Sequence, residues 1–441
     1  MANWSDRAFL ASLLTLFLCR AALASGIVPP WQGPDEPGHF VSARLLSVPY
    51  APLDPVQATL EAQVLESMAR HRWWEPYNEA VPVPLPRRLS EPTAHQMAIP
   101  PFSQSLYHGL AAAVLRLAPA STVDGAYWRL RILSIALGAV TLAAAWAGTH
   151  LLFGPAIAAG ATALAALHPQ FLLAAIAINA DALVILQGAL MWWLVGRVAR
   201  NRRPAMSLLL LVVIAVSVVI TKRSALPLGI VALMVTAGSL LNPRIWSVNL
   251  RASGWMAWFF AAAAAVGWAI WNAFEEPLRY LLVYWQLAMP FRRPDDQVTT
   301  AAALEYARVS VDNAWLKAGW LRFPASEPWF WVTRILTVAG LAGAAGALIR
   351  SADLRRPLLI AWLFVIVHAG SVLGWGFLTL SVPQGRYLLP VLGPATVLLW
   401  VGITRAVPFR ARPYVASGLV ATAAVLDLTA FTTVLMPAYL R

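Results

Sequence analysis

The chain has 441 residues, of which 59% are hydrophobic and only 12% are charged. This composition is too apolar for a soluble globular protein, and many apolar runs approach the roughly 20 residues that span a bilayer as a helix. The net charge of +13 does not indicate nucleic-acid binding, because arginines beside membrane spans explain it through the positive-inside rule. The single cysteine, Cys19, excludes an internal disulfide and a cysteine zinc site. The sequence therefore predicts an all-α polytopic membrane protein.

The first apolar segment, 8–27, ends in a run, Ala22-Leu23-Ala24, that resembles a signal-peptidase site. Arg20 interrupts the apolar region and many further spans follow, so an uncleaved anchor is the favoured interpretation. In chain order we expect about eleven spans, at 8–27, 129–151, 155–170, 171–196, 205–221, 225–241, 254–273, 329–349, 357–378, 386–403 and 413–436.

One more apolar stretch, 98–118, could span the membrane or lie at its surface, and the arginines decide between the two. If it does not span and the N-terminus is cytoplasmic, four short inner loops carry arginines and a single acid, Asp353. If it spans, all four loops move outside unless the N-terminus flips as well. We therefore expect the C-terminus outside, with inner clusters Arg197, Arg200, Arg202, Arg203; Arg244, Arg251; Arg350, Arg355, Arg356; and Arg405, Arg410, Arg412.

This topology makes the chain one transmembrane domain, 1–441, with two large extracytoplasmic segments, 28–128 and 274–328. The first segment should contain juxtamembrane helices. Its stretch 57–74 has apolar residues at helical spacing with charges between them, which predicts a helix lying on the membrane surface.

The segment 31–40, WQGPDEPGHF, places two carboxylates and an imidazole directly after the first span. Asp35 followed by Glu36 and Pro37 is a typical helix start, with Asp35 as the N-cap. Four positions separate Asp35 from His39, so a helix beginning there would put them on one face. Two interpretations remain open for Asp35: a cap alone, or a reactive carboxylate.

Further polar residues fall at the outer ends of spans. Asn179 and Asp181 lie in the outer part of 171–196, where an ionisable group usually faces protein or water. The alternative is a shallow, solvated aspartate. Asp427, in the last span, has no evident partner and receives no role.

Lys222, Arg223 and Arg386 go against the positive-inside trend, which indicates a local reason for their charge. Arginine forks bind phosphate, and Gly385 would let the backbone approach the ligand. Snorkelling to lipid headgroups is the competing explanation. Arg129 and Arg131 also fall outside, and Arg20 is a weaker anion candidate. The sequence contains no Walker loop, dinucleotide fingerprint, serine nucleophile elbow or His-Glu-x-x-His motif.

The heptapeptide 34–40, PDEPGHF, resembles the P-D-E-P-x-H-F signature of a family of bacterial membrane proteins that is itself similar to the C-class glycosyltransferases. Short similarities continue through most of residues 1–400: Arg131-Ile132-Leu133-Ser134, His168-Pro169-Gln170-Phe171, Asn179-Ala180-Asp181, Thr221-Lys222-Arg223 and Gln384-Gly385-Arg386-Tyr387. The run 99–102 with Leu106-Tyr107 resembles the superfamily's H-P-P-L-Y-Y but departs from it, because the histidine is displaced to His95 and Phe102 stands at the leucine position.

The resemblance implies an extracytoplasmic glycosyltransferase that takes a sugar from a polyprenyl-phosphate donor. Its implied catalytic residues are Asp35 as the base, with Glu36 and His39. Glu36 would hold the acceptor or a metal, and a divalent metal on Asp35 and Glu36 is left open. The donor phosphate would bind Lys222, Arg223, Gln384, Arg386 and Tyr387, supported by His95, Arg131, Asn179 and Asp181.

The implied partners are the lipid-linked donor, an envelope glycan, lipid or protein acceptor, and membrane lipids, with no nucleic acid. The implied location is the bacterial inner membrane. The main rival is a transporter or flippase of a lipid-linked envelope precursor. Such proteins usually place ionisable residues near the midplane on broken helices.

Overall fold

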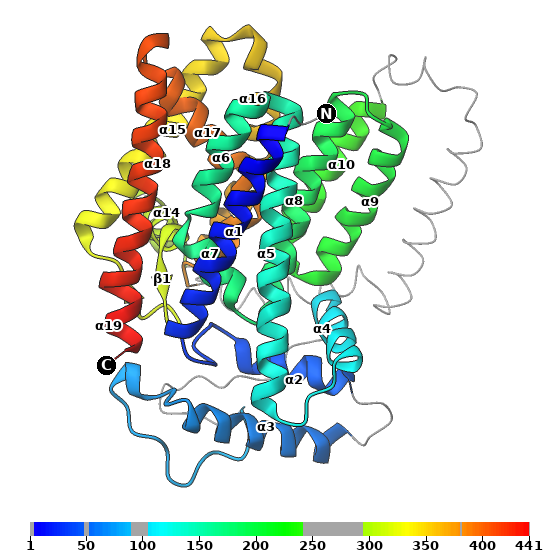
Figure 1. Cartoon of the computed structure of the whole chain (residues 1–441), viewed down its shortest axis with the longest axis vertical. Coiled ribbons are helices and arrows are strands. Elements are labelled where there is room, and N and C mark those ends of the chain that lie inside the picture. Colours follow the sequence, from blue (N-terminus) through cyan, green and yellow to red (C-terminus); the bar gives the residue numbers. More distant parts are fainter. Residues whose placement is uncertain (1–3, 48–52, 90–104, 241–293, 380–381, 441) are drawn as a thin grey trace.

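The computed structural model describes residues 4–47, 53–89, 105–240, 294–379 and 382–440, and it forms a helical bundle (Figure 1). Within these residues eight helices are long and apolar enough to span a membrane, or nine if one bent pair counts as a span. The expectation of a helical, multi-pass membrane protein is thereby confirmed. The eight are α1 (Trp4–Ile27), α5 (Val123–Phe153), α8 (Ala180–Ala199), α9 (Pro204–Thr221), α15 (Glu327–Arg350), α16 (Ala352–Leu378), η6 with α17 (Gly385–Val391 and Leu392–Arg405), and η7, α18, η8 and α19 in succession (Phe409–Ala411, Arg412–Thr429, Ala430–Leu435 and Met436–Tyr439).

The expected spans 155–170 and 171–196 have wrong boundaries. The chain instead forms α6 (Pro155–Ala166), α7 (Pro169–Ile176) and then α8, and α6 and α7 are bent by 64°. Pro169 explains the first break, because the residue before a proline is disfavoured in helical conformation. The second break follows from Asn179, which caps α8 with its side chain.

The expected span 225–241 and the ambiguous stretch 98–118 each contain a short helix. α10 (Leu226–Leu240, after the single turn η2, Arg223–Ala225) has 15 residues, and α4 (Leu106–Leu117) has 12. At about 1.5 Å per residue, α4 is too short for a hydrocarbon core of about 30 Å, which supports the non-spanning interpretation of 98–118. The expected span 254–273 lies outside the described residues.

The juxtamembrane helices α2 (Glu36–Ser47) and α3 (Leu53–Arg70) lie across one end of the bundle, followed by the short turn η1 (Glu75–Tyr77) (Figure 1). The apolar stripe of α3 was expected to face the membrane, and this is wrong. Leu60, Val64 and Met68 are buried in a cluster with Trp31 and Phe40, so the protein itself covers the stripe. Aromatic side chains from the segment after α1 supply the apolar partner that lipid was expected to provide.

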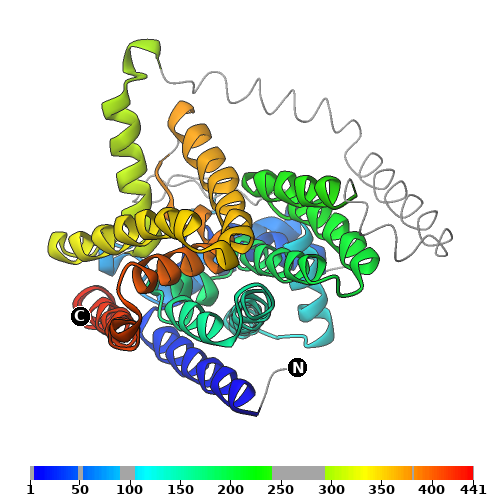
Figure 2. The ribbon, with the colours of Figure 1, turned by 90° about the horizontal axis from the view of Figure 1, so that it is seen from above.

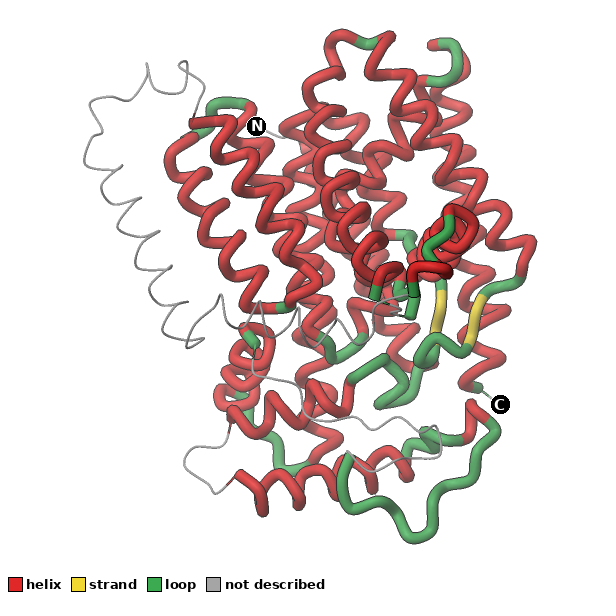
Figure 3. Tube along the Cα trace, turned by 180° about the vertical axis from the view of Figure 1, so that it is seen from behind, coloured by secondary structure: helices red, strands yellow, loops and turns green. Residues whose placement is uncertain are grey.

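The segment 274–328, expected on the extracytoplasmic side, is described from residue 294 onwards. It contains η5 (Asp295–Gln297), α14 (Thr300–Trp315) and a small antiparallel hairpin of β1 (Lys317–Ala318) and β2 (Phe323–Pro324) (Figure 3). The hairpin departs from an all-helical fold. Its turn carries positive φ at Gly319, Trp320 and Leu321, which reverses the chain within a few residues.

Arg20 and Asp427 form a buried ion pair between α1 and α18, with Arg20 Nε 2.8 Å from Asp427 Oδ2. The expectation that Asp427 lacks a partner is therefore wrong. Arg20 also donates to the carbonyl oxygen of Ala166 at the end of α6. A buried charge is stable only when it is paired, so these contacts join three helices.

Glycines allow close packing between α15 and α17. A Cβ on Gly402 would lie 1.8 Å from the carbonyl oxygen of Gly340, so the two backbones touch. Seen from above, α1, α5, α15, α17 and α18 pack around one another as a bundle (Figure 2). The N- and C-terminal ends lie at opposite ends of this bundle (Figure 1).

Candidate functional site

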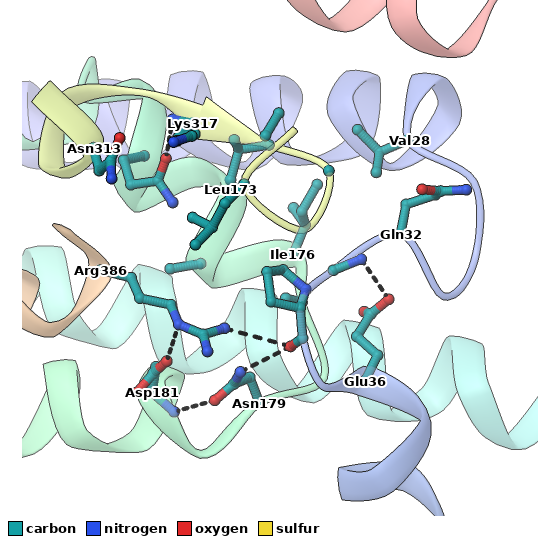
Figure 4. Close-up of a pocket in the computed structure, with 18 of the residues that line it drawn as sticks. Val28, Gln32, Glu36, Leu173, Ile176, Asn179, Asp181, Asn313, Lys317 and Arg386 are labelled. Atoms are coloured by element: carbon teal, nitrogen blue, oxygen red, sulfur yellow. Dashed lines mark hydrogen bonds and ion pairs between the residues drawn. The ribbon is translucent and has the colours of Figure 1, made fainter. Parts of the chain in front are cut away.

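A pocket whose mainly apolar wall carries several charged side chains lies beside the start of α2 (Figure 4). Its walls come from the loop after α1, the starts of α2 and α8, α7, the end of α14, the β1 hairpin and η6. The cavity has a volume of about 40 Å³, which is room for a few water molecules. Glu36, Asp181, Lys317 and Arg386 contribute charged groups to its lining.

Asp35 lies beside this pocket, between two of the residues that line it, Pro34 and Glu36. As predicted, α2 begins at Glu36, and the carbonyl oxygen of Asp35 accepts the His39 N–H at 3.1 Å. Asp35 has φ +69°, a left-handed conformation that aspartate tolerates better than most residues. Its carboxylate is 30% exposed and accepts a 2.5 Å hydrogen bond from Arg386 Nη2.

Arg386 contacts both carboxylates of the site, those of Asp35 and Asp181. Its side chain is only 8% exposed, and its Nε lies 2.9 Å from Gln384 Oε1 and 3.3 Å from Asp181 Oδ2. Its Nη1 reaches the carbonyl oxygen of Pro34 at 3.5 Å. A single guanidinium therefore holds the start of α2 to the start of α8.

Asp181 and Lys222 form a second ion pair of the site, with Lys222 Nζ 2.5 Å from Asp181 Oδ1. Asn179 caps α8 by accepting the Asp181 N–H at 2.9 Å and donates to Pro34 O at 3.1 Å. The ring of Tyr387 lies 4.5 Å from Lys222 Nζ and 5.4 Å from the Arg386 guanidinium carbon, which suits cation–π attraction.

The structure thus joins seven of the predicted site residues in one network of contacts: Asp35, Asn179, Asp181, Lys222, Gln384, Arg386 and Tyr387. Two more predicted residues, Glu36 and Arg131, line the same pocket. Two others cannot be placed in it. His95 and the side chain of Arg223 lie outside what the structure describes. The cations Lys222 and Arg386 are already paired with the carboxylates of Asp181 and Asp35, so any anion must compete with those carboxylates.

The role of Gly385 differs from the expected approach to a ligand. A Cβ at this position would lie 1.8 Å from the backbone nitrogen of Ala314 and 2.2 Å from the carbonyl carbon of Asn313. Gly385 therefore lets η6 pack directly on the end of α14. This contact places Arg386 in the same pocket wall as Lys317 and Gly319 of the hairpin.

Glu36 is fully buried and lines the pocket (Figure 4). Its oxygens accept hydrogen bonds from Gly33 N at 2.9 Å, Ile178 N at 2.9 Å and Tyr127 Oη at 3.0 Å. Burial raises the pKa of Glu36, while Arg131 and these donors act in the opposite direction. The carboxylate ties α2 to α5 and to the segment before α8.

This arrangement does not fit a divalent metal on Asp35 and Glu36. The Glu36 oxygens already accept three hydrogen bonds, and a guanidinium occupies the Asp35 carboxylate. Among the described residues no group of three or more His, Cys, Asp or Glu side chains could hold a metal.

His39 is buried, and its Nδ1 lies 2.9 Å from Nε2 of His108 on α4. Burial, helped by the nearby charges of His108, Lys222 and Arg386, lowers the pKa of His39 well below 6.5. Burial also lowers the pKa of His108 to about 4. The two rings stack with centroids 5.1 Å apart and join α2 to α4.

Arg131 is 1% exposed and supports the loop that carries the site. Its Nη1 donates to the carbonyl oxygens of Val28 at 3.0 Å and Ser25 at 3.3 Å. The guanidinium also stacks on Tyr127 and Trp128. Arg131 thus fixes the path of the chain from α1 towards Asp35.

Sequence reasoning missed Gln170, Asn313 and Lys317, which all line the pocket. Figure 4 shows Asn313 and Lys317 on the side of the pocket away from Glu36. Gln170 Oε1 accepts the backbone N–H of Lys317 at 2.8 Å, and Asn313 donates to Pro383 O at 2.7 Å. Burial lowers the pKa of Lys317, and no described carboxylate forms an ion pair with its ammonium group. Two polar residues, Asn313 and Lys317, inside the otherwise apolar run 313–320 were the available signal.

The chain was compared with protein-family models, curated proteins and solved structures. No family model, no curated protein and no solved structure matches the chain.

Proposed function

We propose that the protein is a glycosyltransferase of the bacterial inner membrane that moves a sugar from a polyprenyl-phosphate donor to an acceptor hydroxyl on the extracytoplasmic side. The observation that carries this proposal is the partly exposed Asp35 carboxylate held by Arg386, within a cluster that also contains Asp181 and Lys222. A carboxylate next to two cations suits a reaction that needs a base and expels an anion.

In the proposed reaction, the acceptor oxygen attacks the anomeric carbon of the donor sugar and forms the new glycosidic bond. The bond between that carbon and the phosphate oxygen breaks, and the lipid phosphate leaves with the electron pair. Asp35 takes the proton from the acceptor hydroxyl, because an alcohol is a weak nucleophile without a base. The leaving phosphate gains negative charge, which Arg386 and Lys222 would stabilise.

Three cations could share the donor phosphate: Lys222, Arg386 and Lys317. Lys317 lines the pocket without a described carboxylate partner, so a phosphate there displaces no existing ion pair. A phosphate that reached Arg386 would compete with Asp35 and leave that carboxylate freer to accept a proton. A second cavity of about 60 Å³, lined by Gln384 and Tyr387 together with apolar residues of α16, adjoins η6 and suits the first part of a prenyl chain.

A hexose is much larger than the 40 Å³ cavity beside Asp35, so donor binding requires part of the wall to move. Gly319 and Leu321 line the pocket. Their turn has positive φ from Gly319 to Leu321 and belongs to a hairpin of only two residues per strand. We infer that this turn is the part of the wall that moves, because a hairpin with such short strands is held by few ladder contacts.

The complete proposal places eleven spans in the membrane, in the arrangement of the C-class glycosyltransferases. The nine candidate spans of the described residues, the short α10 and the undescribed segment 254–273 would together make eleven. The turns that connect α8 to α9, α15 to α16 and α17 to α18 lie at the N-terminal end of the bundle, which supports a cytoplasmic assignment for their arginines (Figure 1).

A transporter or flippase of a lipid-linked precursor is the second candidate, and the 64° bend between α6 and α7 favours it. Broken helices near a polar site are typical of secondary transporters. The two candidates differ in whether the donor is chemically changed. A transporter moves the lipid-linked sugar intact, whereas a transferase releases the polyprenyl phosphate.

Mass spectrometry of envelope glycans tests the proposal in a deletion strain complemented with wild type or with Asp35→Asn. We expect the deletion to remove one sugar from a glycan, lipid or protein of the envelope, and Asp35→Asn to fail to restore it. Restoration by Asp35→Asn at wild-type expression would contradict the proposed base. Accumulation of the same sugar on its lipid carrier, still facing the cytoplasm, would instead indicate the flippase.

A further inference from the structure

A second site lies at the opposite end of the bundle from Asp35. The ends of α5 and α8 and the turn before α9 enclose an open groove of about 730 Å³, within the usual range for ligand sites. Four arginines and two tryptophans dominate its lining: Arg197, Arg200, Arg202, Arg203, Trp146 and Trp193. The start of α1 lies close by, because Asp6 Oδ2 is 3.8 Å from Nε2 of His150, which lines the groove.

Two of the four arginines are fixed in the wall. Arg197 donates from Nε to Ser207 Oγ at 3.1 Å, and its guanidinium carbon lies 5.1 Å from the centroid of the Trp193 ring. Arg200 donates from Nε to the carbonyl oxygen of Leu151, at the end of α5, at 2.6 Å. These contacts hold the guanidinium groups at the groove without neutralising their charge.

The other two, Arg202 and Arg203, are exposed on the turn between α8 and α9. Arg203 has φ +48°. Among the described residues none of the four arginines forms an ion pair with a carboxylate. The C-terminal dipoles of α5 and α8 offset only part of this charge, since each is equivalent to about half an elementary charge.

We propose that this groove binds the headgroup of an anionic phospholipid. A phosphodiester matches the unpaired guanidinium groups through charge-assisted hydrogen bonds. Trp146 and Trp193 suit the polar–apolar boundary where a headgroup lies, and Ala147 and Leu151 give the groove an apolar wall for the glycerol and the first acyl carbons. Basic pockets between spans at the cytoplasmic face are a known means of holding anionic lipids.

The test uses native mass spectrometry of the full-length protein taken from nanodiscs of phosphatidylglycerol or of phosphatidylcholine. Wild type should retain phosphatidylglycerol selectively, and Arg202→Gln/Arg203→Gln should lower its affinity about tenfold or more, because each arginine near the surface contributes substantially to anionic-lipid binding. The matched control is Arg350→Gln/Arg356→Gln, which removes two exposed arginines from the end of α15 and the first turns of α16, outside the groove. The control should retain the lipid as wild type does.

Three results would overturn the proposal. Wild type could retain both lipids equally, which would remove the selectivity. The two double variants could lose affinity equally, which would reduce the effect to general surface charge. Inorganic phosphate at millimolar concentration could displace the lipid completely and bind as tightly, which would make the groove a site for a free anion. A thermal melt of each variant in phosphatidylcholine shows whether it is folded.

Discussion

Asp35 and Arg386 are 351 positions apart in the sequence, and their side chains meet at 2.5 Å. The contact joins the loop after α1 to η6, which begins the candidate span Gly385–Arg405. Arg386 also reaches Asp181, and Asp181 reaches Lys222, so four charges from four separate segments form one balanced cluster. The function proposed above depends on this cluster.

The sidedness of the protein can be tested with single cysteines in a Cys19→Ser background. Leu117 is 87% exposed at the end of α4, and Thr300 is exposed at the start of α14. Both Leu117→Cys and Thr300→Cys should react with an impermeant thiol reagent added outside the cell. Asn201→Cys, in the turn between α8 and α9, should react only after the membrane is opened. Labelling of Leu117→Cys from the cytoplasm alone would rule out the eleven-span topology.

Gly385→Ala should destabilise the protein by roughly 1–3 kcal/mol or more, because its Cβ would clash with the backbone of Ala314. The matched control is Gly374→Ala on α16, where an added Cβ meets nothing within 4 Å. Alanine there should be neutral or slightly stabilising. The measurement is the thermal midpoint in detergent. A Gly385→Ala protein as stable as wild type would show that the glycine serves the ligand rather than the packing of η6.

The buried pair of Arg20 and Asp427 predicts a non-additive result. Arg20→Met alone should cost about 3–5 kcal/mol, because it leaves the Asp427 carboxylate buried without its partner. Arg20→Met combined with Asp427→Leu should recover most of this loss, since both charges are then removed. Unfolding midpoints of the single and double variants measure the coupling. Additive losses would mean that the two side chains do not depend on each other.

The histidine pair predicts loss of stability at acidic pH. The pKa of His39 lies well below 6.5 and that of His108 is about 4 in the folded state, so the unfolded chain binds more protons as pH falls below about 6.5. The free energy of unfolding is therefore not reduced by these histidines above that pH. It decreases as the pH falls towards 4, by at most about 1.4 kcal/mol per pH unit for each histidine. His108→Gln should show a shallower fall in thermal midpoint between pH 7 and 5. An unchanged pH profile would contradict the buried, neutral pair.

Several features could be predicted from the sequence because local rules determine them. The run Asp35-Glu36-Pro37 favours a helix start through local interactions alone, and α2 does begin at Glu36. The expected topology placed Asn179, Lys222 and Arg386 on the same side of the membrane as Asp35, and in the structure all four belong to one network of contacts.

Other features depend on contacts that no local pattern encodes. Arg20 and Asp427 pair across 407 positions. The carboxylate of Glu36 is buried and bonded to the Ile178 N–H, whereas that of the neighbouring Asp35 is partly exposed, and only the packing of distant segments decides this difference. Lys317 lies on a strand of two residues, which is too short to give a periodic signal. The choice of His108 as the partner of His39 follows from how α4 docks on α2, which its own sequence does not specify.

The most direct test of the proposed catalysis is the rate of sugar transfer by purified Asp35→Asn protein in proteoliposomes that contain a polyprenyl-phosphate sugar and the acceptor found by glycan analysis. Asparagine tolerates the left-handed backbone at φ +69° and caps helices as well as aspartate does, so the variant should fold like wild type. Arg386 keeps Asp181 as a partner. Asp296→Asn, which removes an exposed carboxylate from the second outer segment, is the control. We predict that Asp35→Asn lowers the rate by about 10²–10⁴ with an unchanged thermal midpoint, while the control transfers normally. A rate within a few-fold of wild type would contradict Asp35 as the catalytic base.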